Sequence, residues 1–302
     1  MRSPIGILGG KGNMVSKLFK LVPSEYKFYA EPFFGGGSLF FRLPPADIET
    51  INDINGNVMD FYKILQSEEG FERFIKLSLV TPYSREQYNS FRKLWKSEED
   101  PVLKAWRWWV IAKQSFAGDH SWGTAITLSR RGMAATTSKF LSAIDSLPLV
   151  HERLKRCQIE NVDALTIIRR YAVKDAFVYC DPPYMSSTRK SGKYDFEMTD
   201  LDHAELLEMC LESPAKIMIS GYPTELYSKM LSDWDCVKFE TASWAARKTR
   251  GSGNQGKGSS KKLHPRTECV WRNYARKRIV KTPVPKKIKR FPVPKKISCL
   301  KK

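Results

Sequence analysis

Strand-like apolar runs and helical repeats alternate in two separate stretches of the chain. In the first stretch, the pattern predicts strands over 26–31 and 48–52, followed by a helix over 57–66. The second stretch predicts helices over 164–171 and 201–212. It also predicts strands over 158–162, 176–180, 216–220, 235–241 and 267–272. Alternation of this kind is typical of an α/β fold with a mostly parallel sheet.

A different pattern separates the two stretches. Helical repeats over 85–95, 102–116 and 139–144 surround a segment rich in Gly, Ser and Thr. The sequence therefore predicts one α/β domain in two halves, interrupted by a mostly helical insertion. The two halves and the insertion are expected at 1–80, 151–274 and 81–150.

The composition is that of an ordinary globular protein. Of 302 residues, 42% are hydrophobic and 27% are charged, and no apolar run approaches the roughly 20 residues of a membrane-spanning helix. The first residues lack the apolar core of a signal peptide, so we expect a cytoplasmic protein. Six widely spaced cysteines and only four histidines predict neither a disulfide framework nor a metal site.

The net charge of +19 is concentrated in two segments. Residues 247–266 hold seven basic residues and no acid, and residues 276–302 hold twelve more. The first segment is predicted to be a flexible Gly- and Ser-rich loop, and 275–302, which repeats PVPKKI, a disordered tail. Both are either merely solvated or bound to nucleic-acid phosphates, which would make affinity salt-dependent. The candidate contacts in the loop are Arg247, Lys248 and Arg250.

The tetrapeptide Asp181-Pro182-Pro183-Tyr184 directly follows the apolar strand at 176–180. Because proline cannot extend a strand ladder, the tetrapeptide should lie at the carboxyl end of that strand, where open α/β sheets bind ligands. The Asp181 carboxylate and the Pro182 carbonyl can accept both hydrogens of an exocyclic amine, while Tyr184 can stack on an extruded nucleobase. The alternative is a turn that merely ends the strand.

A glycine-rich turn follows the first predicted strand. It reads Glu31-Pro32-Phe33-Phe34-Gly35-Gly36-Gly37-Ser38, and glycines there allow a close approach to a bound cofactor. Asp53 ends the second strand, where nucleoside-binding folds place a carboxylate on ribose hydroxyls. The two features together indicate a cofactor that carries a nucleoside. The spacing of a phosphate-binding loop is absent, which disfavours phosphoryl transfer.

The order of the motifs GGK, EPFFGGGS, IND and DPPY resembles that of the DNA adenine methyltransferases of the Dam type. The resemblance runs from about residue 4 to residue 274 and implies a Rossmann-like α/β sheet that binds S-adenosylmethionine. Lys11 would meet the carboxylate of this cofactor, Asp53 its ribose and Asp163 its adenine, although Asp53 could cap a turn and Asp163 the helix that follows. The implied cofactor contacts are Gly9, Gly10, Lys11, Glu31, Phe33, Gly35, Gly37, Asp53, Asp163 and Asp181.

The resemblance also implies the reaction, which is methyl transfer to the N6 amino group of adenine in double-stranded DNA. Asp181, Pro182, Pro183 and Tyr184 match the catalytic motif, no metal is needed, and the enzyme is expected to be a monomer or weak dimer. The sequence leaves open methylation of RNA or of cytosine N4. It also leaves open an inactive nucleic-acid-binding relative.

The insertion matches the place of the family's target-recognition domain. The stretch from Lys113 to Gly123 resembles versions found in phage and prophage members. Arginine can pair bidentately with guanine, although an exposed basic turn can also be merely solvated. The candidate DNA contacts in the insertion are Lys113, Ser115, Trp122, Arg130 and Arg131.

Overall fold

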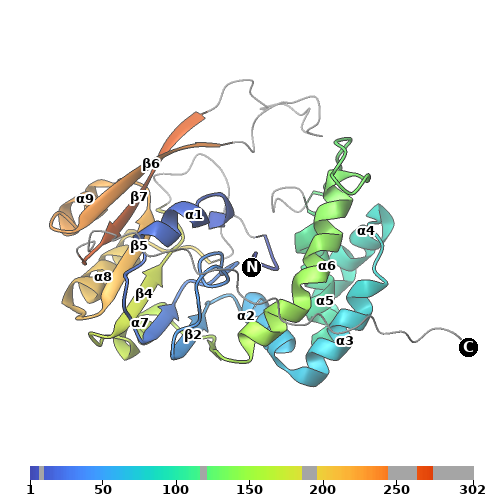
Figure 1. Cartoon of the computed structure of the whole chain (residues 1–302), viewed down its shortest axis with the longest axis horizontal. Coiled ribbons are helices and arrows are strands. Elements are labelled where there is room, and N and C mark those ends of the chain that lie inside the picture. Colours follow the sequence, from blue (N-terminus) through green and yellow to red (C-terminus); the bar gives the residue numbers. More distant parts are fainter. Residues whose placement is uncertain (7–9, 116–120, 186–195, 244–263, 275–302) are drawn as a thin grey trace, which may run out of the picture.

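The computed structural model describes residues 1–6, 10–115, 121–185, 196–243 and 264–274. Its centre is a seven-stranded sheet in the order β3-β2-β1-β4-β5-β7-β6 (Figure 1). The first five strands of this order run parallel, whereas β7 pairs antiparallel with both β5 and β6. The strands are β1 (Phe28–Glu31), β2 (Ile48–Asn52), β3 (Gln158–Glu160), β4 (Ala176–Cys180), β5 (Lys216–Gly221), β6 (Asp235–Ser243) and β7 (His264–Arg272).

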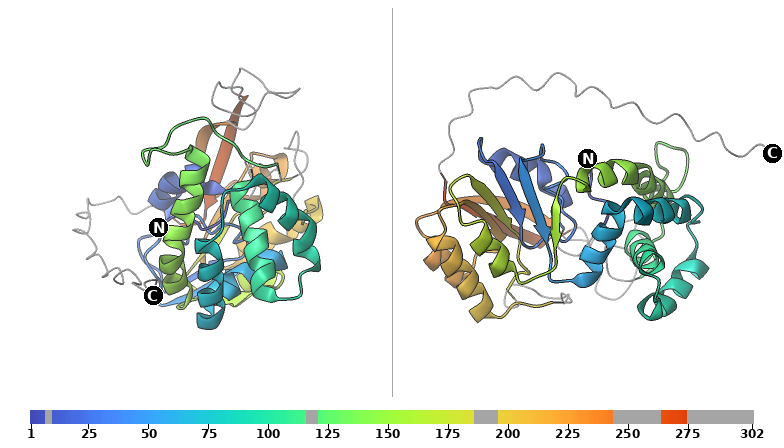
Figure 2. Two further views of the ribbon diagram at one scale, coloured as in Figure 1. Left: turned by 90° about the vertical axis from the view of Figure 1, so that its right-hand side faces the viewer. Right: turned by 90° about the horizontal axis from the view of Figure 1, so that it is seen from below.

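Helices cover both faces of the sheet. Helices α7, α8 and α9 share a buried cluster with one face, and α1 and α2 share another with the opposite face. The right-hand view of Figure 2 shows helices α3 to α6 gathered beside the sheet. The helices are α1 (Val15–Leu18), α2 (Gly56–Gln66), α3 (Glu68–Leu79), α4 (Arg85–Leu94), α5 (Pro101–Gln114), α6 (Ala135–Leu154), α7 (Ala164–Arg170), α8 (Asp200–Glu212) and α9 (Glu225–Met230), with 3-10 turns η1 (Lys11–Asn13), η2 (Phe19–Leu21) and η3 (Trp95–Ser97). None of the described helices is long and apolar enough to cross a membrane.

The predicted Rossmann-like α/β fold is confirmed. Strands β2 and β4 have the predicted bounds, and the bounds of the other strands differ by at most three residues. The basic loop predicted over 247–266 is too long, because residues 264–266 belong to β7 and pair with β6. The rest of that loop and the tail at 275–302 lie outside the described residues.

The helix predicted over 139–144 is too short. Helix α6 has 20 residues and continues through Pro148 and beyond residue 150, where we expected the insertion to end. A proline inside a helix costs about 3 kcal/mol. Leu147, Val150 and Leu154 are completely buried, and their packing offsets that cost.

The helical insertion shares one continuous hydrophobic core with the sheet. Trp109 of α5 and Phe140 of α6 belong to the same buried cluster as Phe177 of β4. At the end of α6, Arg153 forms a buried ion pair with Glu49 of β2. The insertion therefore packs directly against the sheet.

Candidate active site

The carboxyl ends of β1, β2 and β4 bring three predicted site residues to one edge of the sheet. Glu31 ends β1, Asp53 follows β2 and Asp181 follows β4. The chain continues from β1 toward one edge of the sheet and from β4 toward the other. Ligands of open α/β sheets bind in the crevice at such a switch point. Glu31 and Asp181 therefore flank the position at which a ligand is expected.

The glycine-rich turn after β1 has a backbone that requires glycine. Gly35 and Gly37 have φ angles of 47° and 59°, and a Cβ atom on Gly37 would lie 2.3 Å from the Phe34 ring. Phe33 is half-buried against the cluster on the α7 to α9 side of the sheet. The turn therefore presents backbone rather than side chains at the switch point.

Asp53 ties the glycine-rich turn to the end of β2. Its carboxylate accepts hydrogen bonds from the backbone N–H groups of Gly35, over 2.7 Å, and Asn55, over 2.9 Å. Burial raises the pKa of Asp53, and the two N–H donors partly offset this effect. The structure thus shows a turn-capping role for Asp53, and its contact with ribose stays a prediction.

Asn52 connects the loops that follow β1, β2 and β3. Its completely buried side chain donates to the carbonyl of Pro32, over 2.9 Å, and to the carbonyl of Val162, over 3.0 Å. It also accepts from the N–H group of Val162 over 2.9 Å. One side-chain amide therefore sets the spacing of the glycine-rich turn and the loop that carries Asp163.

Asp163 is the N-cap of α7. Its exposed carboxylate accepts from the backbone N–H of Leu165 over 2.7 Å. This is the capping role that the sequence left open, and contact with a cofactor adenine stays a prediction. Gly10 is exposed directly before Lys11, and Gly9 lies outside the described residues.

Glu31 carries an unsatisfied buried oxygen. The residue is 2% exposed, and its Oε2 atom has no hydrogen-bond partner in the described part of the chain. Burial raises the pKa of Glu31 well above its usual range, and the nearby charge of Asp181 raises it further. A buried acceptor without a hydrogen bond destabilises the protein because its desolvation is not compensated. The site is therefore suited to a ligand that presents a hydrogen-bond donor or a cation.

Lys11, Asp181, Tyr184 and Glu268 form one buried polar cluster. The Lys11 Nζ atom lies 2.6 Å from Asp181 Oδ1 and 3.2 Å from Glu268 Oε1. The Tyr184 hydroxyl donates to the same Glu268 oxygen. Lys11 Nζ also lies 4.6 Å from the centre of the Tyr184 ring. The DPPY motif and the N-terminal GGK motif thus meet around a carboxylate from β7.

Burial raises the pKa of Asp181 to about 6. The ammonium group of Lys11 lowers this pKa, and the carboxylate of Glu268 raises it. The pKa of Lys11 responds in the opposite sense. Burial lowers it, but the two carboxylates raise it above the ordinary lysine value. At neutral pH the cluster therefore holds a charged lysine and an ionised Asp181.

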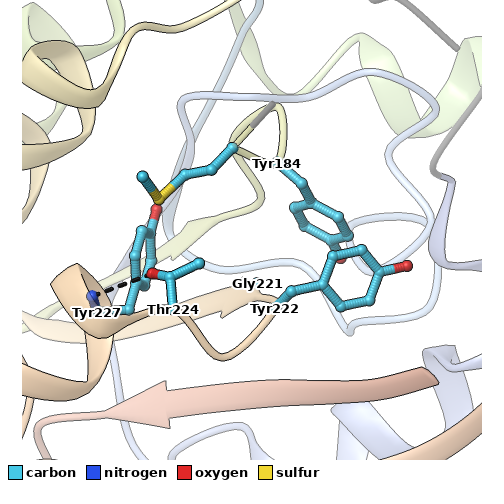
Figure 3. Close-up of a pocket in the computed structure, with 6 residues that line it drawn as sticks. Tyr184, Gly221, Tyr222, Thr224 and Tyr227 are labelled. Carbon is cyan, nitrogen blue, oxygen red and sulfur yellow. Dashed lines mark hydrogen bonds between the residues drawn. The ribbon is translucent and has the colours of Figure 1, made fainter. Parts of the chain in front are cut away.

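Two tyrosines lie together at the ends of β4 and β5 (Figure 3). The rings of Tyr184 and Tyr222 are 4.5 Å apart at an interplanar angle of 65°. They line a cavity of about 10 Å³, shared with Gly221 and Tyr227. This volume holds about one water molecule, and Tyr184 is only 8% exposed. A planar base can therefore reach the Tyr184 ring only if neighbouring side chains move.

The two prolines of the DPPY motif end β4 as expected. Pro182 is buried and Pro183 half-buried, and β4 stops at Cys180. His203 of α8 is buried and contacts the Tyr227 hydroxyl over 2.9 Å. Its Nδ1 atom therefore supports the wall of the small cavity.

The described DNA-contact candidates in the insertion differ in their surroundings. The Ser115 hydroxyl contacts the Tyr88 hydroxyl and the Ile111 carbonyl. Half-buried Trp122 packs against Tyr83 and lies beside the Arg85 guanidinium. These contacts stabilise the insertion itself, so a direct DNA contact by Ser115 or Trp122 stays a prediction.

The remaining candidates in the insertion are basic. Arg131 pairs with Asp145 of α6 over 2.8 Å, whereas exposed Arg130 has no ion pair within the described ranges. Both lie in a tight turn closed by a hydrogen bond from the Gly132 N–H to the Ser129 carbonyl. Lys113 is half-buried near the end of α5. The candidates Arg247, Lys248 and Arg250 lie outside the described residues.

Sequence reasoning missed Glu268 and Tyr222. Glu268 is the only acidic residue between positions 241 and 302, in a segment otherwise rich in lysine and arginine. The sequence could have indicated Glu268 by this isolation alone, because a single acid within a basic segment suggests that it pairs with a specific residue. Tyr222 follows the apolar strand at 216–220 and, like Tyr184, is an aromatic residue placed just beyond the end of a strand.

Comparison with known proteins agrees with this geometry. The chain is 26% identical over 299 residues to the type II methyltransferase M1.LlaDCHI of Lactococcus lactis subsp. cremoris, covering 88% of this chain and 93% of that protein. It is 23% identical to the DNA adenine methylase of Serratia marcescens, covering 72% of this chain and 82% of the relative. A stretch of 60 residues, 20% of this chain and 8% of the relative, is 38% identical to the DNA N-6-adenine-methyltransferase of Escherichia phage P1.

The family profile described as D12 class N6 adenine-specific DNA methyltransferase matches residues 8–249. This range includes the GGK motif, the glycine-rich turn, the insertion and the DPPY motif, and it stops before β7. The chain therefore belongs to the D12 class of N6 adenine-specific DNA methyltransferases.

Proposed function

We propose that this protein transfers a methyl group from S-adenosylmethionine to the N6 atom of adenine within a short sequence of double-stranded DNA. The observation that carries the proposal is the position of Asp181 beside Glu31 at the switch point of the sheet. Glu31 is buried and has an unsatisfied oxygen, which suits a cationic amino-acid group. Asp181 is followed by two prolines and a tyrosine, and this arrangement suits a nucleobase amine.

Glu31, Lys11 and the glycine-rich turn fit the methyl donor. The buried Glu31 Oε2 atom lacks a partner within the described residues, and the α-ammonium group of S-adenosylmethionine would supply one. Lys11 provides a cation for the carboxylate of the donor. The backbone of Gly35 and Gly37 leaves room for the methionine portion, and we expect Asp53 to meet the ribose and Asp163 the adenine.

Asp181 and Pro182 would hold the amino group that is methylated. The amino nitrogen of adenine is a poor nucleophile because its lone pair is delocalised into the ring. Hydrogen bonds from its two hydrogens to the Asp181 carboxylate and the Pro182 carbonyl would favour a pyramidal nitrogen and stabilise the positive charge that develops on it. S-adenosylmethionine supplies a methyl group bound to a sulfonium. As the new N–C bond forms, the bond between the methyl carbon and sulfur would break, and its electron pair would stay on sulfur as a neutral thioether. One N–H proton would then leave through Asp181 or solvent.

Asp181 must be ionised for this role. Its pKa of about 6 leaves it charged at neutral pH, yet close enough to neutrality to accept a proton after the transfer. Activity should therefore fall as the pH drops through about 6. Tyr184 would stack on the extruded adenine once neighbouring side chains have moved.

The helical insertion would read the DNA sequence. The turn that carries Arg130 precedes α6, and Figure 1 shows this turn and the outer ends of β6 and β7 on the same upper side of the molecule. Duplex DNA lying along that side would meet the arginine turn and the β6–β7 hairpin together. We expect the protein to act on cytoplasmic DNA as a monomer or weak dimer, without a metal.

Mapping of modified bases tests this proposal. Genomic DNA from a methylation-deficient host that expresses the protein should contain N6-methyladenine confined to one short motif. Asp181→Ala should abolish the mark but retain donor binding by isothermal titration. Asp175→Ala is the matched control, because Asp175 is exposed and precedes the other end of β4. Unmodified DNA from a folded, donor-binding protein would contradict the proposal and point to an RNA substrate.

A further inference from the structure

We propose that Glu268 is a positioning residue of the methyl-transfer site, which sets the charge around Asp181 and fixes the places of Tyr184 and Lys11. The inference rests on the proposed function. Glu268 lies outside the residues matched by the family profile, and it reaches the site from a strand that follows the catalytic motif by about 80 residues of chain.

Strand β7 brings Glu268 to the carboxyl edge of β5 although it runs antiparallel. Gly221, the last residue of β5, pairs with Cys269, so Glu268 lies one position beyond this pair. Its side chain is 9% exposed, and its Oε1 atom accepts from the Tyr184 hydroxyl and lies 3.2 Å from Lys11 Nζ. A single carboxylate oxygen therefore holds both the aromatic ring and the ammonium group that adjoin Asp181.

The cluster has a formal charge of −1 when both carboxylates are ionised. Lys11 contributes one positive charge, and Asp181 and Glu268 contribute one negative charge each. Other buried ionisable groups on the surrounding elements also interact with the charges of the cluster. They are Glu31, Tyr179, Cys180, Tyr227 and Cys269. A sulfonium donor and a methylated amine are both cationic, so a net negative charge here stabilises them more than it stabilises neutral ligands.

Glu268 also prevents Lys11 from binding Asp181 alone. The ammonium group is shared between the two carboxylates, and the Asp181 carboxylate is also the group expected to accept a hydrogen from the target amine. Without the negative charge of Glu268, Lys11 would pair more strongly with Asp181 and compete with that amine. Glu268 thus keeps Asp181 available as an acceptor.

The variant Glu268→Gln separates charge from packing. Glutamine has the same size and can still accept from Tyr184, but it removes one negative charge. We expect the Kd of S-adenosylmethionine to rise roughly tenfold, whereas the Kd of S-adenosylhomocysteine, which has an uncharged sulfur, should change much less. The acid limb of the pH–activity profile, where transfer is lost as the pH falls, should also move to lower pH, because Glu268 raises the pKa of Asp181.

Isothermal titration of the full-length protein with both ligands provides the test. Glu268→Asp retains the charge and should keep the ratio of the two Kd values near that of the wild type. Glu240→Gln is the matched control, because Glu240 is exposed on β6 and accepts from Thr267, the neighbour of Glu268. If Glu268→Gln does not fold, Lys11→Met can be used instead, because it removes a positive charge rather than a negative one. The ratio of the two Kd values should then shift in favour of S-adenosylmethionine, whose sulfur is cationic.

The outcomes distinguish this inference from the proposed function. Equal weakening of both ligands by Glu268→Gln, with an unmoved acid limb, would show a merely structural role and overturn the inference alone, provided that the wild type methylates DNA. A wild-type protein that binds neither ligand would overturn both. A selective loss of sulfonium binding that Glu268→Asp restores is the expected result.

Discussion

The Nζ atom of Lys11 donates a hydrogen bond to Oδ1 of Asp181 over 2.6 Å, although 170 residues separate the two in the sequence. Lys11 is 6% exposed and Asp181 17% exposed, so water screens this ion pair only weakly. The GGK motif therefore contacts the DPPY motif directly. Its lysine stabilises the ionised form of Asp181, the acid that we propose accepts a hydrogen from the target amine.

Removing the charge of Lys11 should move the acid limb of activity to higher pH. Lys11 lowers the pKa of Asp181, which lies at about 6 in its presence. In Lys11→Met that pKa rises, so more of Asp181 is protonated at pH 6 to 7 and transfer is lost there first. Single-turnover methylation of duplex DNA between pH 5 and 9 measures the shift. The exposed Lys20→Met should leave the profile unchanged, and a shift to lower pH in Lys11→Met would contradict the assignment.

The strands and the position of the DPPY motif were predictable because they depend on local pattern. The apolar strand at 176–180 and the prolines after it define β4 and place Asp181 with few alternatives. The length of α6 was not predictable, because Pro148 indicates a helix end and only burial of Leu147, Val150 and Leu154 overrides it. Tertiary packing, rather than local preference, decides that element.

The polar cluster at the site was only partly predictable for a related reason. Lys11 belongs to the GGK motif, and Asp181 and Tyr184 belong to the DPPY motif, so the sequence already indicated a functional site at these residues. Glu268 gave no motif, because its partners are supplied by antiparallel pairing of β7 with β5. A contact made by strand register across a sheet leaves no spacing signal in the sequence.

Replacing Asn52 should weaken both the fold and donor binding. Asn52→Leu would leave the Pro32 carbonyl and both backbone groups of Val162 without their side-chain partner. Each unsatisfied buried group costs about 1–3 kcal/mol, so urea denaturation should show a loss of about 2 kcal/mol or more. The Kd of S-adenosylmethionine should rise because the glycine-rich turn and the Asp163 loop lose their fixed spacing. Asn89→Leu, on an exposed face of α4, should change neither quantity. Unchanged donor affinity in a destabilised Asn52→Leu would show that the amide acts on stability alone.

Breaking the buried ion pair between Glu49 and Arg153 should destabilise the fold strongly, whereas replacing both residues by apolar ones should destabilise it much less. Glu49 is 2% and Arg153 8% exposed, and removing one partner of such a pair costs about 3–5 kcal/mol. Glu49→Ala should therefore be strongly destabilised in urea, whereas the double variant Glu49→Leu, Arg153→Met should recover most of the loss. Glu160→Ala breaks the more exposed pair with Arg170 and should cost less than about 1 kcal/mol. Equal losses in the two single variants would mean that the burial of the Glu49 pair has no energetic effect.

The ammonium group of Lys113 should make DNA binding depend on pH. Burial lowers its pKa to about 8, helped by the nearby charge of Lys139, and Lys113 forms no ion pair with any residue in the described part of the chain. Its positive charge is therefore lost as the pH rises through about 8, and a DNA phosphate that pairs with it would raise that pKa. We expect DNA affinity to fall between pH 7 and pH 9.

The same lysine should be visible in the salt dependence of binding. Lys113→Gln should bind DNA more weakly at pH 7, lose the pH dependence, and reduce the slope of log affinity against log salt by about 0.9, the value for one phosphate. Lys113→Arg should stay charged at pH 9 and bind equally at both pH values, because arginine does not titrate in this range. Fluorescence anisotropy with a duplex containing the mapped motif measures all three quantities. Lys93→Gln removes an exposed charge from α4 and should retain the pH dependence of the wild type. If Lys113→Gln kept both the pH dependence and the salt slope, Lys113 would not contact DNA, and the arginine turn at 129–132 would remain as the basic element of the insertion that meets the duplex.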